Sequence, residues 1–228
     1  MKGRERNLDR ISFLHESVRQ NIIYFLPMED AIRTSVLSKN WRFVCSSLPN
    51  LKFSDWRYRN KECKNPGLGD FRDMVDQTLI LHDQSDIHTF SISIVSASTP
   101  VSARNLNSWI CFAVRHNVQH ICLQPFHTII EKLPMCLFTR NTLTVLHIEK
   151  IHLHLPTTIA FPLLKSLSFY RVKFVDKNLT NRLLSSCSCP VLEDLKVTCC
   201  FQDHTYMHTI SFACLKYLNL ITYRDEES

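Results

Sequence analysis

The chain has 228 residues, and 45% of them are hydrophobic, which is enough to bury a core and excludes an intrinsically disordered chain. Residues 1–64 carry the whole net charge of +6, so the rest of the chain lacks the basic stripe that a nucleic-acid-binding surface needs. Three glycines are too few for a glycine-rich phosphate loop, and no run of eighteen apolar residues could span a membrane.

Three short helices are expected in the first fifty residues. Apolar residues recur at helical spacing from Val18 to Leu26, and Pro27 ends that run. Asp30 is a candidate N-cap for a second helix and Ser38 for a third. Such a small unit buries little apolar surface, so we expect it to need a neighbouring domain or a partner.

Longer amphipathic helices are expected further along the chain. Asp70 is a candidate cap for a helix with an apolar face made of Phe71, Met74, Val75, Thr78 and Leu79. The same spacing recurs in Leu106, Trp109, Ile110, Ala113 and Val114. A third, shorter helix is expected over residues 179–184.

An L-x-x-L-x-L template recurs six times and predicts a repeat architecture. Its copies begin 21 to 31 residues apart: Ile87-Phe90-Ile92, Val118-Ile121-Leu123, Leu143-Leu146-Ile148, Leu164-Leu167-Phe169, Leu192-Leu195-Val197 and Leu215-Leu218-Leu220. Leucine-rich repeats run about 20–29 residues. The fourth and sixth positions of each copy are expected to point inward on a short strand, and the copies to stack into a parallel sheet.

The N-terminal stretch resembles a plant-type F-box, whose pattern reads D-x-I-S-x-L-P-D-x-I-L, then I-L-x-F-L-P, then D-A-V-R-T-S-V-L-S-K-R-W. This chain keeps Asp9, Ile11, Ser12, Leu14, Phe25, Leu26, Pro27, Asp30, Ala31, Arg33, Thr34, Ser35, Val36, Leu37, Ser38, Lys39 and Trp41. The resemblance implies docking to the Skp adaptor of a Skp–cullin–F-box ubiquitin ligase, and through it to a cullin. It implies no chemistry by the domain itself.

The resemblance and a shared helical face define an expected adaptor-binding set. Its members are Leu14, Val18, Ile22, Ile23, Leu26, Pro27 and Trp41. Two positions depart from the family pattern, because His15 replaces a proline and Arg19 replaces a leucine. Without the proline, the loop loses more conformational entropy when it becomes ordered. Without the leucine, the contact loses about 1.5–3 kcal/mol of burial free energy if that site is fully buried. Arg can partly compensate by laying its aliphatic stem along the surface. Adaptor binding therefore stays the expectation, and whether His15 and Arg19 weaken it is left open.

The repeats resemble those of plant F-box/leucine-rich-repeat proteins of the FBD type, as the stretches FRDMVDQTLILHDQSDIHTFSISI and RLLSSCSCPVLEDLKV indicate. We therefore expect an α+β chain, in which a three-helix F-box precedes an irregular α/β leucine-rich-repeat solenoid with a parallel sheet. The expected divisions are a basic tail (1–8), the F-box (9–52), a linker (53–69) and a repeat domain (70–228) with about six strands and no FBD region.

The outward positions of the strands are expected to bind a target protein. Period-two alternation places the following residues on one face of the sheet: His120, Cys122, His147, Glu149, Ser168, Tyr170, Asp194, Lys196, Tyr217 and Asn219. Tyr170 and Tyr217 are candidate anchors, because aromatic residues dominate binding hot spots.

Catalytic and metal sites are disfavoured. Zinc binding by Cys187, Cys189, Cys199, Cys200, His204 and His208 would require C-x-C and C-C spacings, which suit the metal poorly. No cysteine stands out as an activated nucleophile, and Glu193 and Asp194 are expected on opposite sides of a strand.

The sequence therefore predicts a non-enzymatic substrate receptor without a cofactor, in the cytosol or nucleus, with its ten cysteines reduced. A scaffold or competitor that binds partners without ubiquitin transfer stays open as an alternative.

Overall fold

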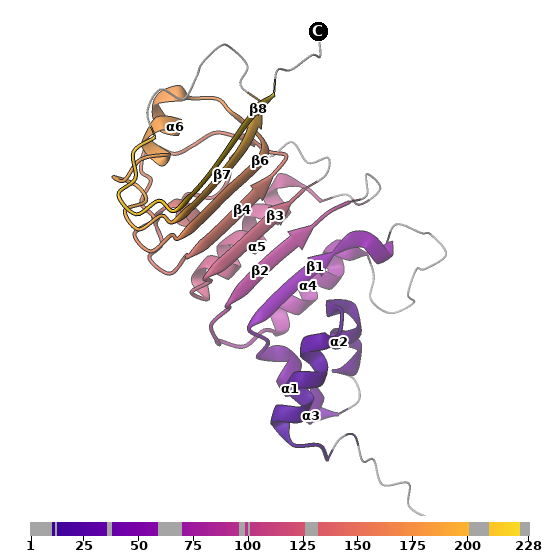
Figure 1. Cartoon of the computed structure of the whole chain (residues 1–228). Helices are drawn as coiled ribbons and strands as arrows, with labels where there is room; N and C mark the ends of the chain where they lie inside the picture. The colour runs from indigo at the N-terminus through magenta and orange to yellow at the C-terminus, as the bar shows by residue number, and fades with distance from the viewer. Residues whose placement is uncertain are drawn as a thin grey trace, which may run out of the picture.

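The computed structural model describes residues 11, 13–35, 38–58, 70–95, 99, 101–125, 132–200 and 210–223. Three N-terminal helices lie at one end of a sheet of eight parallel strands, and further helices connect the strands (Figure 1). No helix in these ranges is long and apolar enough to cross a membrane.

The first two helices are separated by a proline. α1 (Glu16–Phe25) begins after His15, and it ends two residues before Pro27, because a proline disfavours helical geometry in the residue that precedes it. α2 (Met28–Thr34) begins directly after Pro27. The prediction that Asp30 caps this helix is wrong: Asp30 lies in the first turn, where a negative charge complements the helix dipole.

The predicted caps of two other helices are confirmed. Ser38 accepts a hydrogen bond from the Trp41 amide at 3.4 Å and starts α3 (Lys39–Ser46). Asp70 accepts from the Asp73 amide at 2.9 Å and starts α4 (Phe71–Leu81).

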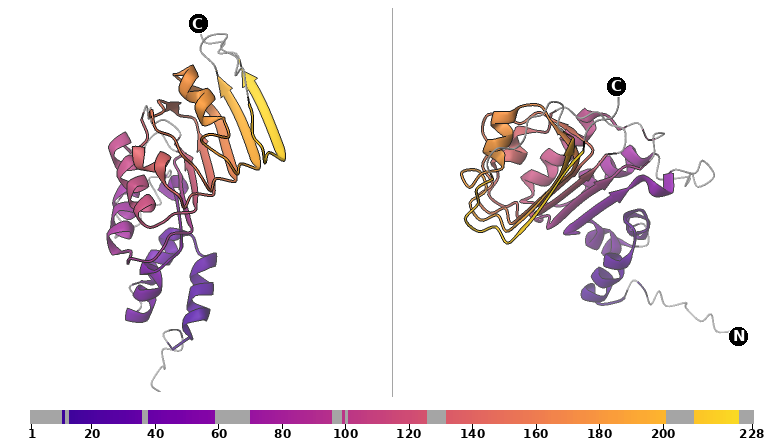
Figure 2. Two further views of the ribbon diagram at one scale, coloured as in Figure 1. Left: turned by 90° about the vertical axis from the view of Figure 1, so that its left-hand side faces the viewer. Right: turned by 45° about the horizontal axis from the view of Figure 1, so that its top comes forward.

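The connecting helices lie on one side of the sheet. They are α4, α5 (Ala103–Arg115) and α6 (Lys177–Leu183), together with the 3-10 turn η3 (Met135–Thr139) (Figure 2). The buried residues of α4 and α5 are those predicted from their spacing, because each helix presents one apolar stripe to the sheet. The opposite face of the sheet carries none of these helices.

The strands are β1 (Asn50–Ser54), β2 (Thr89–Ser93), β3 (His120–Gln124), β4 (Val145–Glu149), β5 (His152–Leu153), β6 (Ser166–Phe174), β7 (Asp194–Cys200) and β8 (Tyr217–Tyr223). Their order is β1-β2-β3-β4-β6-β7-β8, and the short β5 pairs with β6 outside this path. The six predicted copies form β2, β3, β4, β6, β7 and β8. The first core position of each copy stays in register across the sheet, and Leu51 on β1 continues the row: Leu51, Phe90, Ile121, Leu146, Leu167, Leu195 and Leu218.

The sheet begins earlier than predicted. β1 pairs in parallel with β2, so residues 53 and 54 belong to a strand and not to a linker, and the strand number exceeds six. After β1 the turn η1 (Asp55–Tyr58) begins with the fully buried Asp55. Its carboxylate accepts from the Val95 amide at 2.6 Å and from the Thr99 hydroxyl at 2.8 Å. These bonds hold the loop after β2 against the end of β1.

One continuous apolar core joins the N-terminal helices to the strands. It runs from Ile23 on α1 through Leu51 and Phe53 on β1 to Val197 on β7. The two edges of the sheet differ. The inward side chains of β1 are fully buried, whereas Leu218 and Leu220 on β8 are 50% and 42% exposed.

Candidate protein-interaction surfaces

The first candidate surface is an exposed apolar stripe on α1. Val18 and Ile22 lie one helical turn apart and are 42% and 38% exposed, and Phe25 continues the stripe with an exposed ring. Exposed Ile11 and Phe13 precede the helix. Exposed apolar side chains grouped in this way make the stripe a candidate site of protein contact.

The structure separates the predicted adaptor set into two groups. Val18, Ile22 and Pro27 are exposed, and Leu14 and Leu26 are half-buried against the core. Ile23 and Trp41 are 3% and 1% exposed, so these two side chains are buried in the free chain and their contact with a partner stays a prediction. They belong to the packing of α1 against α3. The predicted set leaves out Phe13 and Phe25, although both are apolar, lie within the motif and are exposed.

The two departures from the expected pattern have local structural roles. The His15 ring accepts a hydrogen bond through Nδ1 from the Ser17 amide at 3.4 Å, so it caps α1 in place of the usual proline. The Arg19 side chain is buried and donates from its guanidinium to the Leu14 carbonyl. Arg19 therefore does not project from the exposed stripe.

The second candidate surface is the face of the sheet opposite the helices. The ten predicted target residues are all half-buried or exposed, as expected for strand positions that alternate with the buried set. Strand pairing aligns five residues across the sheet in one row: Cys122, His147, Ser168, Lys196 and Asn219.

A hydrogen-bonded network fixes the centre of this face. The Glu149 carboxylate lies 2.7 Å from His147 Nε2 and accepts from the Gln124 amide at 2.9 Å. Asp194 accepts from the Lys196 ammonium at 3.1 Å and from the Ser166 hydroxyl at 3.2 Å. Both carboxylates on this face are therefore held in fixed positions.

A cation–aromatic pair lies in the middle of β6. The guanidinium of Arg171 lies 5.5 Å from the ring centre of Tyr170. Arg171 has a φ of 51°, a left-handed conformation that is unfavourable for a non-glycine residue, and it coincides with an irregularity in the pairing between Tyr170 and Val172. The bulge turns both Tyr170 and Arg171 outward, so the structure adds Arg171 to the predicted set.

The face does not have the features of a nucleophilic site. Burial raises the pKa of the Cys122 thiol, and the nearby Glu149 raises it further, whereas a reactive thiol needs a lowered pKa. Burial lowers the pKa of His120, and the charge of His88, whose ring centre is 4.4 Å away, adds to that shift.

The proposed zinc ligands can be placed only in part. Cys187 is exposed and Cys189 is buried, so these two side chains do not converge. The side chains of Cys199 and Cys200, together with His204 and His208, lie outside the described residues. Within the described ranges no three His, Cys, Asp or Glu side chains could hold a metal ion. Glu193 pairs with Lys216 at 2.7 Å and Asp194 with Lys196, so the two carboxylates point apart.

Known proteins share both parts of the chain. A family model for the F-box domain matches residues 11–53, and one for the LRR repeats of FBD-associated F-box protein At5g56370 matches residues 106–227. No solved structure matches the chain.

Full-length relatives come from Arabidopsis thaliana. F-box/FBD/LRR-repeat protein At5g56420 is 32% identical over 93% of this chain and 49% of its own length. FBD-associated F-box protein At4g10400 is 31% identical over 94% of this chain and 51% of its own length. F-box protein At4g09920 is 30% identical over 93% of this chain and 66% of its own length. The chain thus spans about half the length of the first two relatives.

Proposed function

Because the chain belongs to the plant F-box/leucine-rich-repeat family, we propose that it is a substrate-recognition subunit of a Skp–cullin–F-box ubiquitin ligase. In this proposal residues 9–52 form a three-helix F-box domain that binds the Skp adaptor. The stacked strands form a leucine-rich-repeat solenoid that binds the target protein, in the cytosol or nucleus. The chain acts by proximity, because it holds the target near a conjugating enzyme and performs no reaction itself.

The exposed stripe on α1 carries the proposal. Val18, Ile22 and Phe25 are apolar side chains on the outer face of a small helical unit, and an apolar surface that is exposed in the free chain gains free energy when a partner covers it. The half-buried Leu14 and Leu26 extend the surface at either end of the helix.

The sheet face supports a separate contact with a target. It offers Tyr170 and Tyr217 as aromatic anchors and Arg171 as a stacked cation, which are the residue types that dominate hot spots. The fixed carboxylates of Glu149 and Asp194 add polar groups whose positions need little further ordering.

Adaptor binding can be tested with purified proteins. We expect Val18→Asp with Ile22→Asp to weaken binding to a Skp adaptor by at least about tenfold, because two apolar contacts, each worth roughly 1.5–3 kcal/mol when fully buried, are replaced by charges. Binding is measured by calorimetry, and circular dichroism checks that the variant is folded. Ile80→Asp on α4 is the matched control, since Ile80 is 80% exposed and belongs to a different helix. Unchanged affinity of a folded double variant would refute the proposed adaptor surface.

The alternative, a scaffold that binds partners without ubiquitin transfer, predicts a different result in a reconstituted ligase. His15 replaces a proline of the family pattern, which favours weaker adaptor binding. A scaffold would bind its target, captured from cells with a blocked proteasome, but would fail to promote its ubiquitination in a reconstituted ligase. A substrate receptor would do both, and Tyr170→Ala with Tyr217→Ala would reduce both together.

A further inference from the structure

A cavity of about 470 Å³ lies between the N-terminal helices and the first strand of the sheet. This volume falls within the range of about 300–1,000 Å³ that is typical of small-molecule sites. Its walls come from α1, the turn before α2, α2 itself, α3 and β1. The position between two structural units is also one where ligand sites commonly occur.

The floor of the cavity is apolar. It is made by buried side chains of the three helices and the segment before β1, namely Ile23, Met28, Ala31, Val44 and Leu48, with Leu26, Pro27 and Pro49 beside them. Among the described residues, no acidic side chain lines the cavity. An apolar molecular body would therefore lose water on entering and would meet no negative charge.

The rim of the cavity is polar and carries one charge. Asn21 and Tyr24 reach it from α1, and Asn50 and Lys52 reach it from β1. Among the residues that the structure describes, none gives these four side-chain head groups a hydrogen bond or an ion pair, and the Tyr24 ring meets the Phe25 ring edge to face. Two amides, a phenol and an ammonium are thus available to a bound molecule.

From this arrangement we infer that the cavity binds a small amphipathic acid, with its apolar body on the floor and its anionic head at Lys52. The ammonium supplies charge complementarity, and the amides of Asn21 and Asn50 donate hydrogen bonds to acceptor oxygens. Because the walls come from both α1–α3 and β1, the ligand would tie the helical unit to the sheet.

On α1 the cavity and the proposed adaptor surface use different sides of the helix, although the cavity also borders Leu26, which extends the adaptor surface beyond the end of the helix. The α1 residues that line it are Gln20, Asn21, Ile23 and Tyr24, whereas the exposed stripe consists of Val18, Ile22 and Phe25. At 100° per residue these two sets fall on different sides of the helix. Variants at Val18 and Ile22 therefore test adaptor binding, and variants at Lys52 and Asn21 test ligand binding, at side chains that the two sites do not share.

The experiment compares octanoate with octanamide, which have the same shape and differ in charge. We expect octanoate to bind the purified chain about fivefold more tightly, as one exposed ion pair allows. Lys52→Met should abolish this preference without changing the octanamide affinity, and Lys177→Met, at the exposed first residue of α6, should leave it intact. Calorimetry measures the affinities, and side-chain NMR signals of Met28, Asn21 and Asn50 locate the ligand.

A second variant tests the cavity itself. Asn21→Trp places a bulky ring at the rim and should remove binding of both probes while the melting temperature and adaptor binding stay unchanged. Equal affinities of the two probes, an unchanged preference in Lys52→Met, binding that survives Asn21→Trp, or no binding at millimolar probe would each overturn the inference.

Discussion

Two cysteines that lie two residues apart, Cys187 and Cys189, occupy opposite environments. Cys187 is exposed, whereas Cys189 is fully buried and its thiol lies 3.5 Å from the Leu183 carbonyl. Burial raises the pKa of the Cys189 thiol to about 12. Since only the thiolate attacks an alkylating reagent, roughly one Cys189 in 10⁴ is reactive at pH 8 even before access is considered.

We therefore expect iodoacetamide at pH 8 to modify Cys187 at least about a hundredfold faster than Cys189. The rates are read by tandem mass spectrometry of the peptide that carries both residues. Raising the pH toward 10 should leave Cys189 mostly protonated, because its pKa lies above that range. In denaturant the two rates should converge. Equal rates without denaturant would contradict the prediction, because Cys189 would then have to be as accessible and as ionised as Cys187.

Neighbouring residues on α1 show why the contact set was only partly predictable. The motif and the spacing did not distinguish Val18, Ile22 and Ile23. Successive side chains on an α-helix are rotated by 100° about its axis, so Ile22 is exposed while Ile23 is buried. The inward face of α1 includes Arg19, a residue type that sequence patterns assign to solvent. Its aliphatic stem and its bond to the Leu14 carbonyl allow this burial, and no local signal in the sequence reveals that bond.

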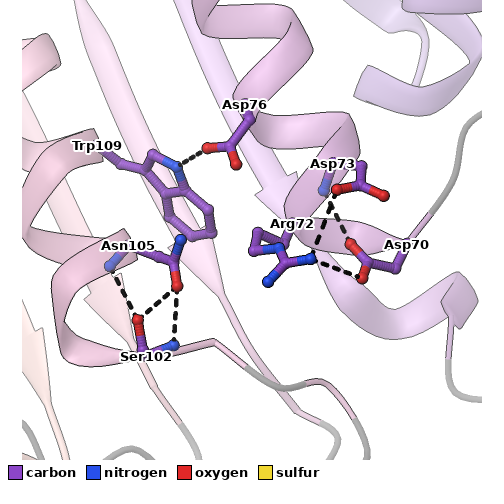
Figure 3. Close-up of polar contacts among 7 residues, drawn as sticks. All are labelled: Asp70, Arg72, Asp73, Asp76, Ser102, Asn105 and Trp109. Atoms are coloured by element: carbon purple, nitrogen blue, oxygen red, sulfur yellow. Dashed lines mark hydrogen bonds and ion pairs between the residues drawn. The ribbon is translucent and has the colours of Figure 1, made fainter.

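At the scale of the element, α5 depends on a reciprocal cap. Ser102 Oγ accepts from the Asn105 amide at 3.2 Å, and Asn105 Oδ1 accepts from the Ser102 amide at 3.3 Å (Figure 3). The same helix is tied to α4 by Trp109, whose indole donates to the Asp76 carboxylate at 2.6 Å. The cap thus fixes the start of a helix that covers the centre of the sheet.

We expect Ser102→Ala to lower the free energy of unfolding by about 1 kcal/mol, within the range of 0.5–2 kcal/mol for lost N-caps. The control is Ser108→Ala in the same helix. The exposed Ser108 hydroxyl donates a hydrogen bond to the Asn105 carbonyl and caps no helix end. Urea titration followed by circular dichroism measures both. A Ser102 variant as stable as the Ser108 variant would mean that solvent replaces the cap without loss.

The sequence predicted the elements whose apolar residues recur with a clear helical or repeat spacing. It missed β1, whose copy of the repeat template stands far from the next one. The buried stripes of α4 and α5 follow from their spacing because each helix packs against a single surface. β1 was missed although Leu48, Leu51 and Phe53 fit the repeat template, because the next copy begins 39 residues later, at Ile87. The cavity beside β1 was not predictable, since it arises only where α1–α3 meet the strand.

At the scale of the whole molecule, the parallel register determines which surfaces remain open. Each inward row runs without interruption from β1 to β8, so every strand is covered by its neighbours except at the two ends. Both end strands have one hydrogen-bonded neighbour, but only β1 also meets the N-terminal helices. The ends therefore differ in burial and not in strand pairing.

This difference predicts where the chain opens first. Leu218 and Leu220 are about half exposed on β8, whereas Leu51 and Phe53 are fully buried on β1. Half burial of two such side chains forgoes about 2 kcal/mol, which corresponds to roughly thirtyfold in an opening equilibrium. Amides of residues 215–220 should therefore exchange with solvent faster than those of residues 143–148 in the purified 228-residue chain, as hydrogen-exchange mass spectrometry can measure. β1 serves as the control, because it is also an edge strand and should remain protected. If β8 and β4 were equally protected, the exposed leucines would have to be covered in solution, for instance by a second copy of the chain, and a concentration series would reveal that association.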